Sequence, residues 1–458
     1  MSLRKQFIRL LLPYCLILLG LTASCKSHNK SGQSNKPLSY TTVATKVCPS
    51  DTTQSYDIYL PTSYSTKKKW PVIYVFDAHG DGKLAVNHFK EAAERFGYIV
   101  IGSNNSRNGL QTLDHTLDIL MKDTKNEYPI DPDRIYAGGF SGGGRVAAIV
   151  ATKYGNCKGI ITCSAGAQGV NPQTIASKFD IYAIAGREDF NFAEVMDIQQ
   201  QFVNTDWRTL ATSFDGGHAW PPINYITNAV LWFQLGAMKD GLIPKNDDLI
   251  DQTLDTFKLK YEHYLATNQF IKAADECKMG ISYLSGLRST KKLEKKLREI
   301  QAQDGFKNEL RSMEQLQMME EQLRNGYMQA FVNQDINWWH NELNGLANSI
   351  KQTTDLNTRQ MYSRVKGFLG IVCYSYTSKA IQDNNDALTA KCLEIYETLE
   401  PENPDCFYYK ALYLNKKNQY KEASEALGKA VEFGFKEIPK ARVQLSQKTL
   451  QLFDNMSK

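Results

Sequence analysis

Residues 138–144 read GGFSGGG, and this stretch decides how the chain around it is expected to fold. The pattern G-x-S-x-G lies between an apolar run, residues 134–138, and a helical run, residues 145–153. Glycines around Ser141 permit a turn so tight that a Cβ atom would clash. Such a turn presents a serine at a helix N-terminus, where backbone amides stabilise negative charge. We predict Ser141 as a nucleophile; the alternative is a glycine-rich turn with a structural role alone.

On both sides of this motif, from residue 39 to about residue 238, short β-branched and aromatic runs alternate with longer helical stretches. The alternation predicts an α/β fold with a doubly wound, mostly parallel sheet. Several of the runs are continuously apolar, as strands buried on both faces are. The expected strands are residues 56–60, 72–76, 99–102, 134–138, 159–163, 181–185 and 210–214. The expected helices are residues 88–96, 110–127, 144–153, 192–205 and 223–238.

A serine hydroxyl is a poor nucleophile until a base removes its proton, so a histidine is expected further along the chain. Of the seven histidines, only His218 lies in a loop after a late strand, within the stretch DGGHAWP at residues 215–221. That is where the base of such a site belongs. We predict His218 as the base, with a surface histidine in a turn as the alternative.

A carboxylate is expected between the serine and the histidine in chain order, because it orients the imidazole. The strand at residues 181–185 is followed by GREDFN, residues 186–191. This places two carboxylates at the carboxyl end of a parallel strand. We predict Asp189 as the acid and keep Glu188 as the fallback, which would otherwise pair with Arg187 as a solvated charge.

The negative charge that develops on a substrate oxygen needs two backbone N–H donors. The residue after the nucleophile, Gly142, supplies one. The loop after the strand at residues 72–76 should supply the other, from the backbone of Gly80 or Asp81. A carboxylate facing the oxyanion would destabilise it, so we expect the Asp81 side chain to point away. His79, in the same loop, is expected to have a structural role.

Two further motifs resemble a known family. IDPDRIY, residues 130–136, runs into GFSGG, and GGHAWP follows at residues 216–221. The combination resembles the α/β-hydrolases of the feruloyl esterase and polyhydroxyalkanoate depolymerase group, over about residues 56–233. The resemblance implies hydrolysis of carboxylic esters through an acyl-enzyme. Ala78 and Ala185 depart from the group's usual residues, which concerns the substrate more than the reaction class.

Composition excludes several classes of protein. The chain has 458 residues, 42% hydrophobic and 22% charged, which is typical of globular domains. Its 54 basic and 49 acidic side chains leave a net charge of only +5, so nucleic acid is not expected as a partner. The nine cysteines include no C-x-x-C pair, and we predict neither a metal site nor a cofactor.

The N-terminus reads as an export signal. Basic residues precede an apolar run at residues 10–21, which is too short to span a bilayer as a mature helix. Thr22-Ala23-Ser24-Cys25 resembles the lipobox of bacterial lipoproteins, which implies lipidation of Cys25 and a membrane anchor. An ordinary secretory signal is the alternative. We expect a signal peptide at residues 1–24 and a polar tether at residues 25–38.

From about residue 251 the sequence is poor in glycine and helical in period. A set of small and aromatic positions recurs with a constant shift, which resembles the tetratricopeptide repeat. A weaker copy runs through Cys373, Ala380, Asn384 and Leu393 to Pro401. Residues 303–331 are expected to form a helix hairpin whose buried stripe is Met313, Leu316, Met319 and Leu323. The first copy is Phe257, Tyr261, Tyr264, Asn268, Phe270, Ala273, Cys277 and Gly280; the second is Phe407, Ala411, Leu414, Asn418, Tyr420, Ala423, Leu427 and Ala430.

The sequence therefore predicts a hydrolase domain at residues 39–238, a linker at 239–252 and an all-α, repeat-like domain at 253–458. The favoured function is an exported, membrane-anchored serine esterase acting on an ester-bearing small molecule or polysaccharide. Two alternatives stay open: an interaction protein whose helical repeats bind a protein partner beside a degenerate hydrolase domain, and a serine peptidase on the same fold.

Overall fold

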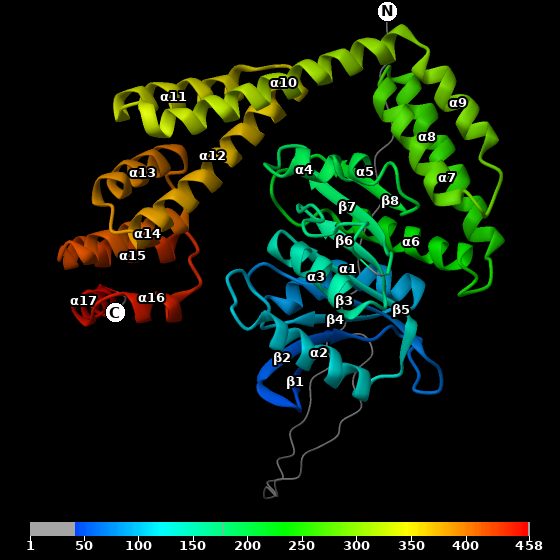
Figure 1. Cartoon of the computed structure of the whole chain (residues 1–458), viewed down its shortest axis with the longest axis horizontal. Helices are drawn as coiled ribbons and strands as arrows, with labels where there is room; N and C mark the ends of the chain where they lie inside the picture. The colour runs from blue at the N-terminus through cyan, green and yellow to red at the C-terminus, as the bar shows by residue number, and fades with distance from the viewer. Residues whose placement is uncertain (1–41, 176, 457–458) are drawn as a thin grey trace, which may run out of the picture. The chain divides into compact units, whose positions relative to one another are not determined.

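The computed structural model describes residues 42–175 and 177–456, and within them one eight-stranded sheet (Figure 1). Its strands follow the order β1-β2-β4-β3-β5-β6-β7-β8, so that β1 and β2 lie at one edge and β8 at the other. The strands are β1 (Ala44–Cys48), β2 (Asp51–Tyr59), β3 (Trp70–Phe76), β4 (Ile99–Ser103), β5 (Ile130–Phe140), β6 (Cys157–Cys163), β7 (Asp180–Gly186) and β8 (Thr209–Phe214).

The sheet is mostly parallel, as the sequence predicts. Strand β2 runs antiparallel to both β1 and β4, and every pairing from β4 to β8 is parallel. Strands β3, β4 and β7 are buried along their whole length, which accounts for their continuously apolar sequences. Because parallel strands share one carboxyl edge, the loops after β3, β5, β7 and β8 meet there. The predicted α/β-hydrolase fold class is confirmed, and β1 is an additional edge strand.

Six helices accompany the sheet, and one differs from its prediction. The expected helix at residues 192–205 is two short helices that meet at Asp197, whose carboxylate accepts a hydrogen bond from the side chain of Gln201. Asp favours such helix ends over helix interiors because its side chain competes for backbone hydrogen bonds. The helices are α1 (Gly82–Phe96), α2 (Leu113–Glu127), α3 (Gly142–Tyr154), α4 (Phe192–Met196), α5 (Ile198–Gln201) and α6 (Ile223–Lys239).

A helical region follows, joined to α6 by residues 240–246. The expected hairpin at residues 303–331 is wrong: α10 is one continuous helix, since no proline interrupts it. Of the expected stripe, Met313 is 41% and Met319 is 36% exposed, whereas Leu316 and Leu323 are partly buried against a hydrophobic core of the helical region. The helices are α7 (Asp247–Ala266), α8 (Phe270–Leu284), α9 (Lys291–Gln301), α10 (Asp304–Asn333), α11 (Ile336–Gln352), α12 (Leu356–Gln382), α13 (Asp386–Leu399), α14 (Pro404–Lys416), α15 (Tyr420–Glu432), α16 (Ile438–Gln444) and α17 (Gln447–Met456).

The recurring sequence positions correspond to helix pairs. Asn268, Asn384 and Asn418 each occupy the turn of one pair in left-handed backbone, with φ of 54°, 58° and 59°. Asparagine tolerates this conformation better than other residues with a side chain. In the first pair Gly280 lies against Phe257, where an added Cβ would stand 3.2 Å from the Phe257 Cβ. These contacts explain the repeat pattern; the tetratricopeptide likeness and the domain boundaries stay predictions.

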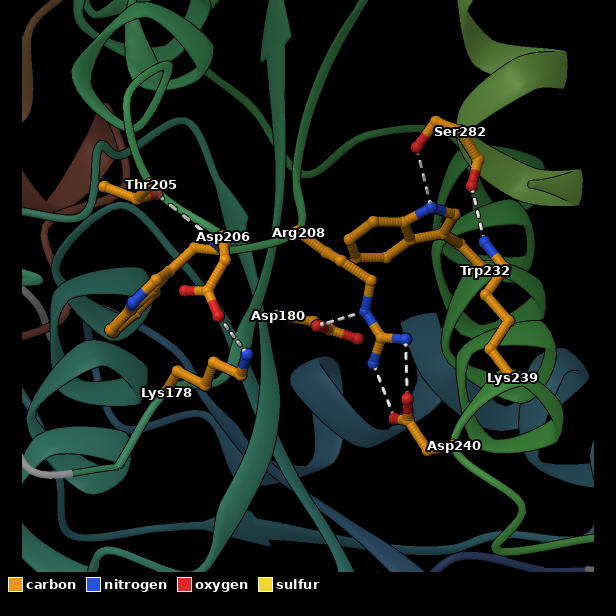
Figure 2. A network of polar contacts seen from close by, with 10 residues as sticks. Lys178, Asp180, Thr205, Asp206, Arg208, Trp232, Lys239, Asp240 and Ser282 are labelled. Carbon is orange, nitrogen blue, oxygen red and sulfur yellow. Dashed lines mark hydrogen bonds and ion pairs between the residues drawn. The ribbon is translucent and has the colours of Figure 1, made fainter. Parts of the chain in front are cut away.

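Polar contacts join the last sheet helix, α6, to α8 (Figure 2). The Lys239 ammonium donates to the Ser282 carbonyl at 2.7 Å, and the Trp232 indole N–H donates to the Ser282 hydroxyl at 3.1 Å. Close by, Arg208 binds Asp180 at 2.7 Å and Asp240 through two hydrogen bonds. One hydrophobic core also runs from the sheet into α7, α8 and α9. The start of the helical region is therefore packed on the α/β layer.

The predicted signal peptide, the tether and Cys25 lie outside the described residues. Within residues 42–175 and 177–456, no helix has both the length and the apolar character needed to cross a bilayer. The seven cysteines of this part are all buried thiols.

The environment of Lys239 makes stability depend on pH. Burial, reinforced by the positive charge of Arg208, lowers its pKa from 10.5 to about 8. Between these values the unfolded state binds more protons than the folded state, so stability rises with pH. We expect the free energy of unfolding of the wild type to rise by about 2 kcal/mol relative to that of Lys239→Met between pH 7.5 and 10, as measured by urea unfolding. Lys178→Met, at a side chain 60% exposed, is the control. If the free energies of unfolding of the wild type and Lys239→Met differed by the same amount at every pH in this range, the expectation would be contradicted.

Candidate active site

Ser141 occupies a strained turn between β5 and α3. Its backbone has φ 53° and ψ −120°, a combination that non-glycine residues rarely adopt and that costs roughly 1–3 kcal/mol. The Ser141 N–H donates to the Cys163 carbonyl at 2.8 Å, which ties the turn to the end of β6. An added Cβ at Gly143 would stand 2.0 Å from the Phe76 carbonyl oxygen. The glycines therefore let β5 and α3 approach β3 closely enough to hold the serine in this conformation.

His218 lies in the loop between β8 and α6 and reaches Ser141. Its Nε2 is 3.0 Å from the Ser141 Oγ, and its Nδ1 is 2.9 Å from the Asp189 Oδ1. A carboxylate only accepts, so Nδ1 carries the proton and Nε2 is left to accept the serine proton. The His218 ring stacks on Phe190 with ring centroids 4.3 Å apart and lies 4.9 Å from Phe140. The imidazole is thus held both by hydrogen bonds and by rings.

Asp189 is the carboxylate that the structure brings to His218. It follows β7, has no exposed surface, and its Oδ1 also accepts the Asn191 N–H at 2.8 Å. Glu188 is half-buried, and its backbone N–H donates to the Gly216 carbonyl at 2.8 Å. Arg187 does not require Glu188 as a partner, since its Nε is 3.4 Å from an Asp215 carboxylate oxygen.

The hydrogen bond between Asp189 and His218 requires the loop after β7 and the loop after β8 to lie with their backbones in contact. The Arg187 N–H donates to the Phe214 carbonyl at 2.8 Å, extending the β7–β8 pairing beyond the strands. At Gly186, an added Cβ would stand 2.3 Å from the carbonyl oxygens of both Gly216 and Gly217. The absence of a side chain at Gly186 therefore brings the Asp189 loop and the His218 loop together.

The three predicted oxyanion donors differ in their surroundings and in the hydrogen bonds that they already make. Gly142 is the first residue of α3, directly after Ser141, and the Asn108 side chain lies over it, 1.7 Å from where a Cβ would be. The Gly80 N–H already donates to the Asp77 carbonyl at 3.1 Å within a turn. This engagement counts against Gly80 and leaves Asp81 as the better of the two. The Asp81 carboxylate caps α1 by accepting the Leu84 N–H at 2.8 Å, in line with the expectation that it points away.

Several residues that support the site were not among the predicted ones. Buried Asp77 accepts the Trp220 indole N–H at 3.0 Å and the His79 backbone N–H at 2.8 Å. The His79 side chain is exposed, and the structural role expected for it stays a prediction. His88 stacks on Trp220 at 4.7 Å between ring centroids, and burial lowers the pKa of His88. The signal in the sequence was Trp220, within the motif that contains His218; nothing in the sequence marked Asp77 as its partner.

The described residues contain no group of three His, Cys, Asp or Glu side chains arranged to hold a metal ion. The site itself places a hydroxyl, an imidazole and a carboxylate in hydrogen-bonded sequence, beside the N-terminus of α3.

Neither a protein-family model nor a curated protein matches the chain. Solved structures do resemble its α/β region. A fluorophosphonate-binding serine hydrolase of Staphylococcus aureus is 16% identical over 42% of this chain and 96% of its own, with a TM-score of 0.33. An S-formylglutathione hydrolase from the same organism is 15% identical over 42% and 98%, with a TM-score of 0.34. A ferulic acid esterase is 15% identical over 41% and 94%, with a TM-score of 0.32.

The close approach at Gly186 can be tested by a matched pair of substitutions. We expect Gly186→Ala to destabilise the protein by about 1–3 kcal/mol, because the new Cβ must push two backbone carbonyls apart. Gly217→Ala lies in the same contact, yet an added Cβ there meets nothing within 4 Å. Thermal unfolding of both variants measures the difference. Equal effects of the two substitutions would show that the approach is not the constraint we describe.

Proposed function

We propose that this chain is a serine hydrolase that cleaves carboxylic esters through an acyl-enzyme, with Ser141, His218 and Asp189 as its catalytic triad. One observation carries the proposal: Asp189, His218 and Ser141 form a continuous chain of hydrogen bonds of 2.9 and 3.0 Å. The strained backbone of Ser141 supports it further, since such strain clusters at functional sites.

The geometry supports a two-step reaction. As the Ser141 Oγ attacks the ester carbonyl carbon, its proton passes to the His218 Nε2, and the Asp189 carboxylate stabilises the resulting imidazolium. The carbonyl oxygen becomes an oxyanion and accepts the Gly142 N–H together with a second donor, for which Asp81 is the candidate. His218 then gives its proton to the departing alcohol. Water, activated by the same imidazole, hydrolyses the acyl-enzyme and releases the carboxylic acid.

The substrate class follows from the sequence resemblance and from the surroundings of His218. The motifs at residues 130–136 and 216–221 favour an ester-bearing polysaccharide or an aromatic ester. The rings of Phe140 and Phe190 make the neighbourhood of the nucleophile apolar, which suits a neutral acyl group. A serine peptidase would use the same hydrogen-bond chain, so a comparison of matched ester and amide substrates separates the two.

We also propose that the protein acts outside the cytoplasm, anchored through a lipid on Cys25. The support is the apolar run, the small residues before Cys25 and the polar stretch after it. In this account Cys25→Ser moves the protein from the membrane fraction to the soluble fraction of the cells that export it. Unchanged fractionation of the variant would rule out a lipid anchor on this cysteine.

The nucleophile is tested by Ser141→Ala. We expect this variant to lose hydrolysis of a small activated ester, such as p-nitrophenyl acetate, by a factor on the order of 10⁴ or more, because Ser141 is the one hydroxyl among the described residues that is hydrogen-bonded to His218. The fold should persist, because the substitution removes only the hydroxyl oxygen of a side chain that is not part of the hydrophobic core. Circular dichroism supplies the control for folding. Wild-type turnover in a folded Ser141→Ala protein would exclude Ser141 as the nucleophile.

The two carboxylates after β7 are separated by replacing each with its amide. Asp189→Asn keeps the shape but cannot stabilise the imidazolium, and we expect turnover to fall on the order of 10⁴-fold. Glu188→Gln should retain turnover within about threefold, because this half-buried side chain makes no described contact with His218. The ratio of kcat between the variants decides the assignment. A collapse in Glu188→Gln with survival of Asp189→Asn would reverse the roles.

A further inference from the structure

We propose that the helical region supplies positioning residues to the active site: Arg324 and Glu320 of α10 and Arg364 of α12 together hold the loop that carries Asp189. We call these three side chains the arginine clamp. The inference rests on the proposed function, because it assigns the clamp a role in keeping Asp189 on His218. In this proposal the helical region positions a residue of the active site.

The clamp is a buried cluster of charges. Glu320 is shared between the two arginines: its Oε1 is 2.6 Å from the Arg324 Nη2, and its Oε2 is 2.8 Å from the Arg364 Nε and 2.6 Å from the Arg364 Nη2. The side chains of Glu320, Arg364 and Arg324 are only 7%, 10% and 20% exposed. Desolvating three charges is costly, and a single carboxylate leaves one positive charge without a counter-ion. The remaining donors need other acceptors.

Each arginine finds one such acceptor in a backbone carbonyl on either side of Asp189, while the buried Arg324 Nε has no hydrogen-bond partner among the described residues. The Arg364 Nη1 donates to the Arg187 carbonyl at 2.7 Å, and the Arg324 Nη2 donates to the Phe190 carbonyl at 3.1 Å. Within the loop, the Asp189 N–H donates to the Gly186 carbonyl at 3.1 Å. The Gly186 and Asp189 carbonyls thus accept N–H groups of the segment itself, whereas the Arg187 and Phe190 carbonyls accept from the helical region. Removing an arginine would leave one of these carbonyls without its side-chain partner and so loosen the loop around Asp189.

A second path runs through aromatic rings. Phe190, which stacks on His218, also lies against Gly367 of α12, where an added Cβ would stand 3.3 Å from the Phe190 ring. The Arg364 guanidinium lies over the Phe192 ring, 4.9 Å from its centroid. Helix α12 therefore contacts the loop at the Arg187 carbonyl and at Phe190, and contacts Phe192 where α4 begins. The clamp and this packing restrain both the acid and the ring that backs the imidazole.

The experiment compares Arg364→Met with wild type in the full chain. Fluorophosphonate titration counts competent sites, so that kcat is expressed per site and unfolded protein does not contribute. We expect kcat to fall about 10–100-fold, with KM changed less than about threefold, because a displacement of about 1 Å in a catalytic group has an effect of this size. Arg324→Met, at the more exposed arginine, serves if Arg364→Met does not fold. Arg288→Met, which breaks an ion pair with Asp251 elsewhere in the helical region, is the matched control and should retain wild-type kcat.

Combination with Asp189→Asn distinguishes positioning from general structural support. If the clamp acts through Asp189, Arg364→Met should cause less than about a threefold further loss in the Asp189→Asn background, since the interaction it supports is already gone. Losses that multiply, or an undiminished kcat per site in both clamp variants, would overturn the proposal.

A readout without turnover separates this proposal from the proposed function. The proton NMR signal of the His218 Nδ1–H, assigned by its loss in a His218→Gln variant, reports the hydrogen bond to Asp189. We expect it to weaken or disappear in Arg364→Met and to persist in Arg288→Met. Its persistence in Arg364→Met would overturn the clamp even in a protein without esterase activity, whereas absent turnover in wild type would refute the esterase alone.

Discussion

The site depends on one close backbone approach, that of Gly186 to the carbonyl groups of Gly216 and Gly217. Parallel strands bring β7 and β8 side by side, but side chains would normally keep their following loops apart. Without a Cβ at Gly186, the Asp189 loop can pair with the His218 loop, and the imidazole then spans the distance from Asp189 to Ser141.

The fold was predictable because its signals are local. Continuously apolar strands such as β3 and β7, separated by helical stretches, indicate a parallel sheet without knowledge of any distant contact. The predictions that proved wrong also relied on local periodicity. Residues 192–205 carry helical periodicity yet break at Asp197, and the methionines of α10 have core-like spacing although Met313 and Met319 are exposed. Periodicity shows which face is apolar; it does not show whether another element covers that face.

The residues of the candidate site were predictable to the extent that they lie in motifs. Ser141 and His218 are marked by their glycine neighbours, and the strand before Asp189 places a carboxylate at the shared edge. The engagement of the Gly80 N–H in a turn was not predictable, since it depends on loop geometry. Nor was the arginine clamp: Arg364 meets the Arg187 carbonyl across 177 positions of the chain, and its sequence neighbours are those of an ordinary helix. Contacts of this range need the folded structure.

The central claim is that Ser141 is a nucleophile activated by His218 and Asp189. Mass spectrometry of the wild-type chain after reaction with a fluorophosphonate tests it most directly, because the reagent forms a stable bond with an activated serine and leaves ordinary serines unmodified. The account predicts one phosphonyl adduct, on the peptide that contains Ser141, formed much more slowly in Asp189→Asn. A folded wild-type protein that forms no adduct, or forms it on another residue, would contradict the claim.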